Sequence, residues 1–378
     1  MLHPKRASAR RVLFTVLAAV LLAALVAGCG KKNDNKANAD KVGLPGSGEG
    51  TVIATYDGGQ ITSGEFDKYT AFMEVSDPQT AMYLQIPQFK EQFVKQFALY
   101  KVMYGRATDA QAKAADEDVK NFETSINDAL KTSTDLKSQL DQKKLTVDEM
   151  KKIVKVLATG SQIAKAQSDE FTKAVTDAEI KAEYDKNKAD YNIVTVRHVL
   201  VATTDSTTGK QLRSDDEALK RAKEAKDKLD KGGDWNAIAK QYSDDPGSKD
   251  KGGLYEKQQA KGWDTDFKNA ANTQPIGKIG EPVQSQFGYH VIKVESREET
   301  AYDKLAQADK DELKQSVVST KVQNYLQSEE EKLNVKVTLP AEPSASPSAS
   351  ASPGASASPS APASPSVSAS PSSSPASK

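Results

Sequence analysis

Two short stretches of alternating apolar residues stand out in the second half of the sequence, and each carries a histidine. The first covers residues 192–201 with His198, and the second covers residues 286–295 with His290. Both are rich in β-branched residues, which favour strands, and successive side chains of a strand point to opposite faces. Each histidine therefore shares a face with apolar residues of its own strand. If the two strands pair with these faces aligned, the two imidazoles meet on one side of a sheet.

The sequence before residue 190 follows a helical period instead. A strand, a glycine turn and a return strand are expected over residues 51–61, and a helix is expected to begin at Ser63. Further helices follow from apolar residues spaced three or four apart and from Thr-x-x-Glu capping boxes. The helical signals are Phe89, Phe93, Phe97, Tyr100 and Tyr104; Val119, Phe122, Ile126 and Leu130, with Leu136 and Leu140 as a continuation; and capping boxes at Thr146 and Thr176. Such stripes usually form a core, although the aromatic one could also line a cradle for unfolded chains.

The segment between the histidine strands mixes both patterns. Ser214 is expected to cap a helix, and a shorter helix follows from residue 234. Residues 243–262 are glycine-rich and predict an irregular stretch, a helical turn surrounds Phe267, and residues 276–283 predict a short strand. This order of elements is typical of a small α+β domain.

A long charged helix is expected over residues 301–333, because apolar residues recur on one side of it. These are Leu305, Leu313, Val317 or Val318, Val322 and Leu326. We expect it to pack back on the N-terminal helices. A mainly helical lobe would then combine residues 51–190 with a helix and short strand from residues 300–339.

Composition adds few constraints on function. A chain of 378 residues with 37% apolar and 28% charged residues can bury a core, and we expect two lobes plus tails. The formal net charge is zero, so nucleic-acid binding is not expected. No third ligand follows the two histidines at a recognisable spacing, so no metal is expected either.

The first 28 residues are typical of a targeting segment. A basic start leads into an apolar run that ends in Val26-Ala-Gly-Cys29. The run is shorter than the roughly 20 residues of a transmembrane helix, and it resembles a secretory signal with a lipobox. The lipobox implies cleavage before Cys29 and a lipid on its thiol, which would anchor the protein to the outer face of the cytoplasmic membrane. The alternative is an uncleaved membrane anchor.

Low-complexity segments follow the signal and end the chain. Residues 29–50 are polar and glycine-rich, and we expect a flexible tether there. Residues 340–378 are almost wholly Ser, Ala and Pro, so we expect a disordered tail. This tail could contact the cell wall, or it could be a solvated segment without a partner.

Five blocks in the second half resemble the parvulin family of peptidyl-prolyl isomerases. They are Arg197-His-Val-Leu-Val201, Tyr242-Ser-Asp-Asp-Pro-Gly-Ser248, Gly252-Gly-Leu254, Gly280-Glu-Pro-Val283 and Phe287-Gly-Tyr-His-Val-Ile-Lys-Val294. The resemblance implies a parvulin (FKBP-like) antiparallel sheet with surrounding helices over residues 191–299. The flanking segments resemble the helical lobe of PrsA-type and SurA-type foldases, so with the lipobox the chain resembles a PrsA-like foldase lipoprotein.

The resemblance also implies a set of site residues. Rotation of an Xaa-Pro bond crosses a barrier of about 20 kcal/mol because twisting destroys amide resonance, and lowering it requires neither a nucleophile nor a cofactor. The site has to bind the twisted amide better than either planar form. By the resemblance, the catalytic positions are His198, Asp245, His290 and Ser285, and the proline pocket consists of Leu254, Trp263 and Phe267. The histidines and Ser285 would then tune the environment of Asp245 beside the rotating bond.

Structural interpretations of the same residues stay open. A buried histidine is commonly a hydrogen-bonded core group, and Asp245 could simply form an Asx-Pro-Gly turn. Trp263 and Phe267 are four residues apart and could be ordinary core. The sequence also departs from the family: residues 252–256 lack the Asp of Gly-Gly-Asp-Leu-Gly, the loop to Phe267 is about one residue longer, and Trp263 replaces the usual Met. We therefore expect a slot of altered shape.

The leading hypothesis is an extracytoplasmic peptidyl-prolyl isomerase and foldase. Its partners would be unfolded or newly exported polypeptides that contain Xaa-Pro bonds. The alternative is a binding-only chaperone with a catalytically weak parvulin domain, and turnover of a proline peptide separates the two. A third hypothesis is a cell-wall structural protein built around the tail, which deletion of residues 340–378 would test.

Overall fold

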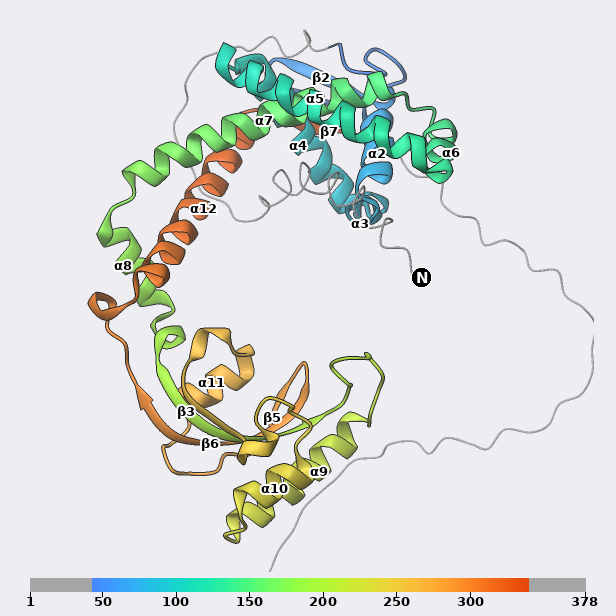
Figure 1. The fold of residues 1–378 in the computed structure, drawn as a ribbon. Coiled ribbons are helices and arrows are strands. Elements are labelled where there is room, and N and C mark those ends of the chain that lie inside the picture. Colours follow the sequence, from blue (N-terminus) through green and yellow to red (C-terminus); the bar gives the residue numbers. More distant parts are fainter. Residues whose placement is uncertain (1–42, 340–378) are drawn as a thin grey trace, which may run out of the picture. The chain divides into compact units, whose positions relative to one another are not determined.

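The computed structural model describes residues 43–339 of the chain. The expected signal segment, the expected lipidation site at Cys29, most of the expected tether and the expected tail lie outside the described residues. Within residues 43–339, no helix combines the length and the apolar composition that crossing a bilayer requires. The described residues form helices around two antiparallel sheets (Figure 1).

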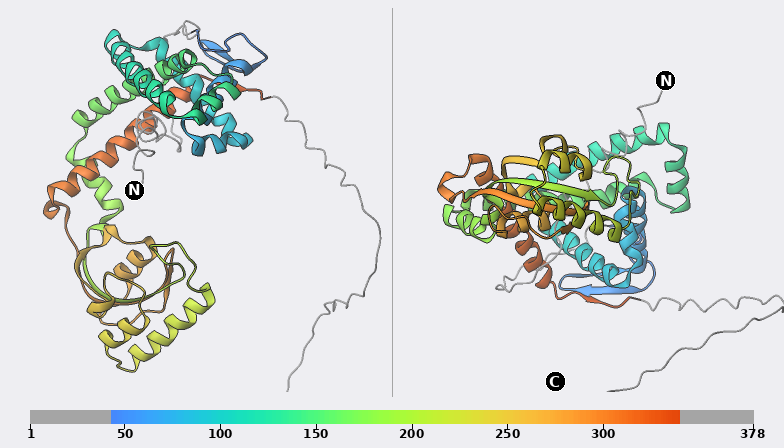
Figure 2. Two further views of the ribbon diagram at one scale, coloured as in Figure 1. Left: turned by 45° about the vertical axis from the view of Figure 1, so that its right-hand side comes forward. Right: turned by 90° about the horizontal axis from the view of Figure 1, so that it is seen from below.

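The first group of elements, which we call the helical lobe, contains a three-stranded sheet and long helices. The strand order is β2-β1-β7, with β1 (Val52–Tyr56), β2 (Gly59–Thr62) and β7 (Lys336–Val337). The helices are α2 (Ser63–Ser76), α3 (Pro78–Ala81), η2 (Met82–Gln85), α4 (Pro87–Arg106), α5 (Asp109–Thr132), α6 (Thr134–Gln142), α7 (Val147–Ala174) and α12 (Gln307–Glu331). Although far apart in the sequence, α7 and α12 run side by side (Figures 1 and 2).

One large apolar core holds the helical lobe together. Phe97 and Tyr100 of the aromatic stripe lie in this core, whereas Phe89 at the start of α4 is 45% exposed. The stripe is therefore mainly core, as its spacing favours. The predicted capping boxes at Thr146 and Thr176 are confirmed. Each Thr hydroxyl accepts from the backbone N–H of the Glu three residues later, and the carboxylate of that Glu accepts from the backbone N–H of the Thr. The second box begins α8 (Asp177–Lys186), which leads through η3 (Lys188–Tyr191) into the next sheet.

Two details of the helical lobe differ from the predictions. The tether does not extend to residue 50, because Leu44 is 4% exposed and belongs to the core. Gly46, at φ +76°, brings the chain so close to the backbone of Gly64 that no side chain would fit there. The helix that begins before Val119 also does not continue to Leu140. This helix, α5, ends at Thr132, and Ser133 caps a separate helix, α6.

The second group of elements, which we call the sheet domain, is a four-stranded antiparallel sheet in the order β4-β3-β6-β5. Its strands are β3 (Ile193–Ala202), β4 (Leu254–Gln259), β5 (Val283–Ser285) and β6 (Gly288–Glu298). Helices α9 (Asp215–Asp230) and α10 (Trp235–Tyr242) pack on one face, and α11 (Thr265–Thr273) packs on the other (Figure 1). The predicted α+β class with an antiparallel sheet is confirmed.

Two strand predictions within the sheet domain are wrong. Residues 243–262 are not irregular throughout, because β4 lies within them and pairs with β3. Residues 276–283 do not form a strand. Ile279 makes one isolated bridge to Lys293, and the strand in this part begins only at Val283. Pro282 has no N–H to donate to a ladder, which disfavours a longer strand.

Candidate active site

The two histidines meet on one face of the sheet. β3 and β6 are antiparallel neighbours, and their register pairs His198 with Ile292 and His290 with Leu200. The two positions are thus offset by two residues, so both side chains project from the same face. Their Nδ1 atoms are 3.3 Å apart, the ring planes are 21° from parallel, and both residues are buried. The meeting of the rings follows the predicted alternation, while their catalytic roles stay a prediction.

Asp245 lies in the loop between α10 and β4, against His198. Its Oδ2 is 2.9 Å from His198 Nε2 and accepts hydrogen bonds from the hydroxyls of Ser248 and, at 3.0 Å, Tyr255. Its Oδ1 accepts from the backbone N–H of Gly247 at 3.1 Å. The Asp-Pro-Gly sequence therefore does form a turn, and this turn also places a carboxylate on the histidine pair.

The two residues before Asp245 anchor its loop to β3. The N–H of Asp244 donates to the carbonyl of Leu200 at 2.7 Å, and the hydroxyl of Ser243 accepts from the N–H of Leu200 at 3.2 Å. The carboxylate of Asp244 accepts from the N–H of Ala202 at 3.0 Å and forms an ion pair with Arg213 at 2.6 Å. These bonds fix the distance between Asp245 and the strand that carries His198.

One carboxyl group and one imidazole of the site have shifted pKa values. Burial opposes ionisation of Asp245, but hydrogen bonds from His198 and Ser248 outweigh it and hold the pKa of Asp245 well below its usual value. Burial, together with the neighbouring His198, lowers the pKa of His290 to about 3. At neutral pH, Asp245 is therefore ionised and His290 is uncharged.

The ionised carboxylate sets the direction of its hydrogen bond with His198. The ionised Asp245 can only accept, so His198 carries a hydrogen on Nε2. The Nδ1 atoms of the two imidazoles share one hydrogen bond, and His290 Nε2 is hydrogen-bonded to the hydroxyl of Ser285 at 2.8 Å. The oxygen of Ser285 in turn accepts from the N–H of Phe287 at 3.1 Å. The four predicted catalytic residues thus form one hydrogen-bonded chain from Ser285 through both histidines to Asp245.

Aromatic rings adjoin this chain, and we call Trp263 and Phe267 the aromatic wall. Phe267, in the first turn of α11, makes edge contacts with the rings of His198 and His290 at centroid distances of 5.1 and 5.0 Å. Trp263 packs edge-on against Phe267 at 5.1 Å and is partly exposed. The site therefore combines a buried polar chain with an apolar surface that reaches solvent through Trp263.

Leu254 does not lie on the face of the histidines, which corrects its predicted place in the proline pocket. In the register of β3 and β4, Arg197 pairs with Leu254 and Val196 pairs with Tyr255. Val196 shares the face of His198, so Tyr255 lies on that face and Leu254 on the other.

The sequence prediction also missed Ser248, which is 1% exposed and bonded to both Asp245 and His198. Ser248 ends one of the five matched blocks, so its place was visible although its role was not. Among the described residues, no three His, Cys, Asp or Glu side chains are grouped so that they could hold a metal ion.

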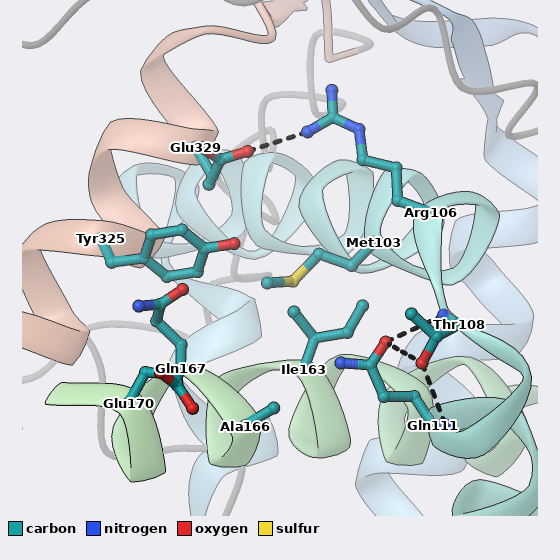
Figure 3. A pocket seen from close by; sticks show the side chains of 10 residues that line it. All are labelled: Met103, Arg106, Thr108, Gln111, Ile163, Ala166, Gln167, Glu170, Tyr325 and Glu329. Carbon is teal, nitrogen blue, oxygen red and sulfur yellow. Dashed lines mark hydrogen bonds and ion pairs between the residues drawn. The ribbon is translucent and has the colours of Figure 1, made fainter. Parts of the chain in front are cut away.

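The helical lobe contains a separate pocket of about 320 Å³. Figure 3 shows Met103 of α4, Ile163 of α7 and Tyr325 of α12 gathered around it, with an ion pair of 2.8 Å between Arg106 and Glu329 beside them. The complete lining is Met103, Arg106, Thr108, Gln111, Ile163, Ala166, Gln167, Glu170, Tyr325 and Glu329.

The same lobe exposes an apolar surface where η2 passes into α4. Met82 is 72% exposed, Tyr83 52%, Ile86 43% and Phe89 45%. The rings of Tyr83 and Phe89 contact each other edge-on at 5.3 Å. A contiguous group of exposed apolar side chains is typical of a surface that binds other polypeptides.

Comparison with known proteins identifies the class of this chain. Residues 180–298 match the family model of the PPIC-type PPIase domain, which spans the whole hydrogen-bonded chain described above. The fold and the site thus define a peptidyl-prolyl cis-trans isomerase.

The comparison with whole proteins goes further. The foldase protein PrsA of Clostridium acetobutylicum is 31% identical over 299 residues, which cover 73% of this chain and 83% of that protein. The chain therefore belongs to the PrsA foldase family. Foldase protein PrsA 4 of Bacillus cereus is 39% identical over 105 residues, which cover 28% of this chain and 36% of that protein. A crystal structure of PrsA from Bacillus cereus aligns at 25% identity and a TM-score of 0.33, covering 73% of this chain and 90% of that one.

Proposed function

We propose that the chain isomerises Xaa-Pro bonds of exported polypeptides at the hydrogen-bonded chain between Ser285 and Asp245. The observation that carries this proposal is the continuity of that chain, from the Ser285 hydroxyl through two stacked imidazoles to an ionised carboxylate. Phe267 of the aromatic wall packs edge-on against both imidazoles, and the wall would supply the apolar surface for a pyrrolidine ring.

The reaction makes and breaks no covalent bond, so the site acts on charge distribution. Twisting the amide ends its resonance, which removes negative charge from the carbonyl oxygen and returns a lone pair to nitrogen. A carboxylate beside the carbonyl is repelled more by the planar amide than by the twisted one. Asp245 would thus lower the barrier by binding the two states differently. Ser285, His290 and His198 are positioning residues that keep this carboxylate in place and ionised.

Turnover of a proline-containing peptide by the full chain tests this assignment. His290→Ala interrupts the hydrogen-bonded chain, and Asp245→Ala removes the carboxylate, so both variants should approach the uncatalysed rate while keeping their circular dichroism spectra. A wild-type rate equal to the uncatalysed rate would instead favour a chaperone that only binds. Wild-type turnover in Asp245→Ala would refute the role given to that carboxylate.

Two observations favour an additional role in holding unfolded clients. The helical lobe combines the pocket in Figure 3 with the exposed apolar surface at Met82, Tyr83, Ile86 and Phe89. Methionine and aromatic side chains adapt to many apolar partners. Suppression of aggregation by the catalytically impaired Asp245→Ala protein tests this role. Loss of that suppression in Met82→Ser with Phe89→Ser would support it, and full suppression in this double variant would contradict it.

The chain would act outside the cytoplasmic membrane, because PrsA foldase homologues are extracytoplasmic. The finer proposal is a lipid anchor at Cys29, supported by the Val-Ala-Gly-Cys sequence after an apolar run. Mass spectrometry of the membrane fraction should find Cys29 acylated at a new N-terminus, and Cys29→Ser should release the protein. Contact of residues 340–378 with the cell wall stays a prediction, tested by wall binding of a chain that lacks them.

A further inference from the structure

Tyr255 joins the site from the edge strand β4. Its ring stacks on that of His198, with centroids 5.4 Å apart and planes 30° from parallel. Its hydroxyl lies 3.0 Å from Oδ2 of Asp245. Burial, together with the charge of Asp245, raises the pKa of Tyr255 to about 12, so the hydroxyl stays protonated and donates. An apolar side chain at this position would supply no such donor.

The turn at Asp245 leaves room for this hydroxyl. A Cβ at Gly247 would lie 2.5 Å from the hydroxyl oxygen of Tyr255, which is closer than such atoms approach. The backbone N–H of the same glycine donates to Oδ1 of Asp245. Gly247 therefore donates one hydrogen bond to the carboxylate and also leaves space for the Tyr255 hydroxyl, which donates another.

The donors are distributed unevenly over the carboxylate. Oδ2 is bonded to His198, Ser248 and Tyr255, whereas Oδ1 accepts from Gly247 among the described residues. A carboxylate oxygen can accept about two hydrogen bonds. The three donors therefore crowd Oδ2 and restrain rotation of the carboxylate, whereas Oδ1, with one donor, keeps acceptor capacity.

We propose that Tyr255 is a positioning residue of the isomerase, whose hydroxyl holds the Asp245 carboxylate so that Oδ1 faces the rotating amide. This inference rests on the proposed role of Asp245. Because the phenol donates to Asp245 and not to the substrate, its loss should slow turnover more than it weakens binding.

Tyr255→Phe in the full chain tests the inference, since it removes the hydroxyl and keeps the ring. Tyr289→Phe is the matched control, because Tyr289 packs among residues on the opposite face of β6. We expect kcat of Tyr255→Phe to fall about tenfold, the lower range for a hydrogen bond to a charged group, with KM little changed. The loss of activity at low pH should also begin at a higher pH than in the wild type, because a donor to the ionised carboxylate is gone. Tyr289→Phe should match the wild type.

The outcomes separate this inference from the proposed function. Wild-type kcat and pH profile in Tyr255→Phe, with turnover still lost in Asp245→Ala, overturn the inference alone. A lower melting temperature without a change in kcat or pH profile also overturns it, because Tyr255 would then be purely structural. Wild-type turnover in Asp245→Ala overturns both.

Discussion

Acid should destabilise the sheet domain through His290, because this imidazole is buried and uncharged. Its pKa is about 3 in the folded protein, against about 6.5 in an unfolded chain. Between these values the unfolded chain binds a proton that the folded chain does not. The contribution of His290 is therefore complete above about pH 6.5 and is lost as the pH falls toward 3. From about pH 7.5 to about pH 5.0, this one group should cost about 2 kcal/mol of the free energy of unfolding.

Tryptophan fluorescence isolates the relevant transition. The two tryptophans of the chain, Trp235 and Trp263, both pack in the sheet domain. With a urea m-value of about 1.5 kcal/mol/M, the unfolding midpoint should fall by about 1.3 M between the two pH values through His290 alone. His290→Gln lacks the titrating imidazole and should show a pH shift smaller by that amount. An equal shift in both proteins would refute the reasoning.

Further substitutions test the remaining parts of the structure. Trp263→Ala should raise KM for a proline peptide several-fold because it removes part of the aromatic wall. Leu254→Ala should leave kcat and KM unchanged, because Leu254 lies on the other face of the sheet. Equal effects of the two substitutions in steady-state assays would contradict the strand register. Lys101→Met should cost the helical lobe about 3–5 kcal/mol, because it leaves the buried carboxylate of Glu65 without its partner at 2.9 Å. Urea unfolding followed by circular dichroism measures this loss, and adding Glu65→Leu should recover most of it. Thr146→Ala should cost about 1 kcal/mol because it removes the capping box of α7, and an unchanged midpoint would show that the cap contributes nothing.

The histidine pair could be predicted because β3 and β6 are the central strands of their sheet. Their apolar residues contact helices on both faces, so the pattern that defines these strands lies in their own side chains. The position of each histidine then followed from alternation alone. The family resemblance contributed Asp245 and Ser285, which no periodicity marks.

β4 could not be predicted for the opposite reason. It is an edge strand whose residues are Leu-Tyr-Glu-Lys-Gln-Gln, and none of them is buried. It forms because the outer edge of β3 offers unpaired backbone groups that need partners. Because β4 was not predicted, its register with β3 was not known, and Leu254 was assigned to the face of the sheet on which Tyr255 lies. Leu44 escaped prediction similarly, since a lone leucine among glycines carries no period.

The helical lobe draws its sheet from the two far ends of the described chain. Ala54 and Thr55 of β1 pair with Val337 and Lys336 of β7, and Leu333 just before β7 is 1% exposed within the lobe's core. Strands β3 to β6 lie between these partners in the sequence. During synthesis the sheet domain can therefore finish folding before the helical lobe, because β7 is the last strand of that lobe to be made. A chain truncated after residue 300 would keep every residue of the candidate site but would lack α12 and β7 of the helical lobe.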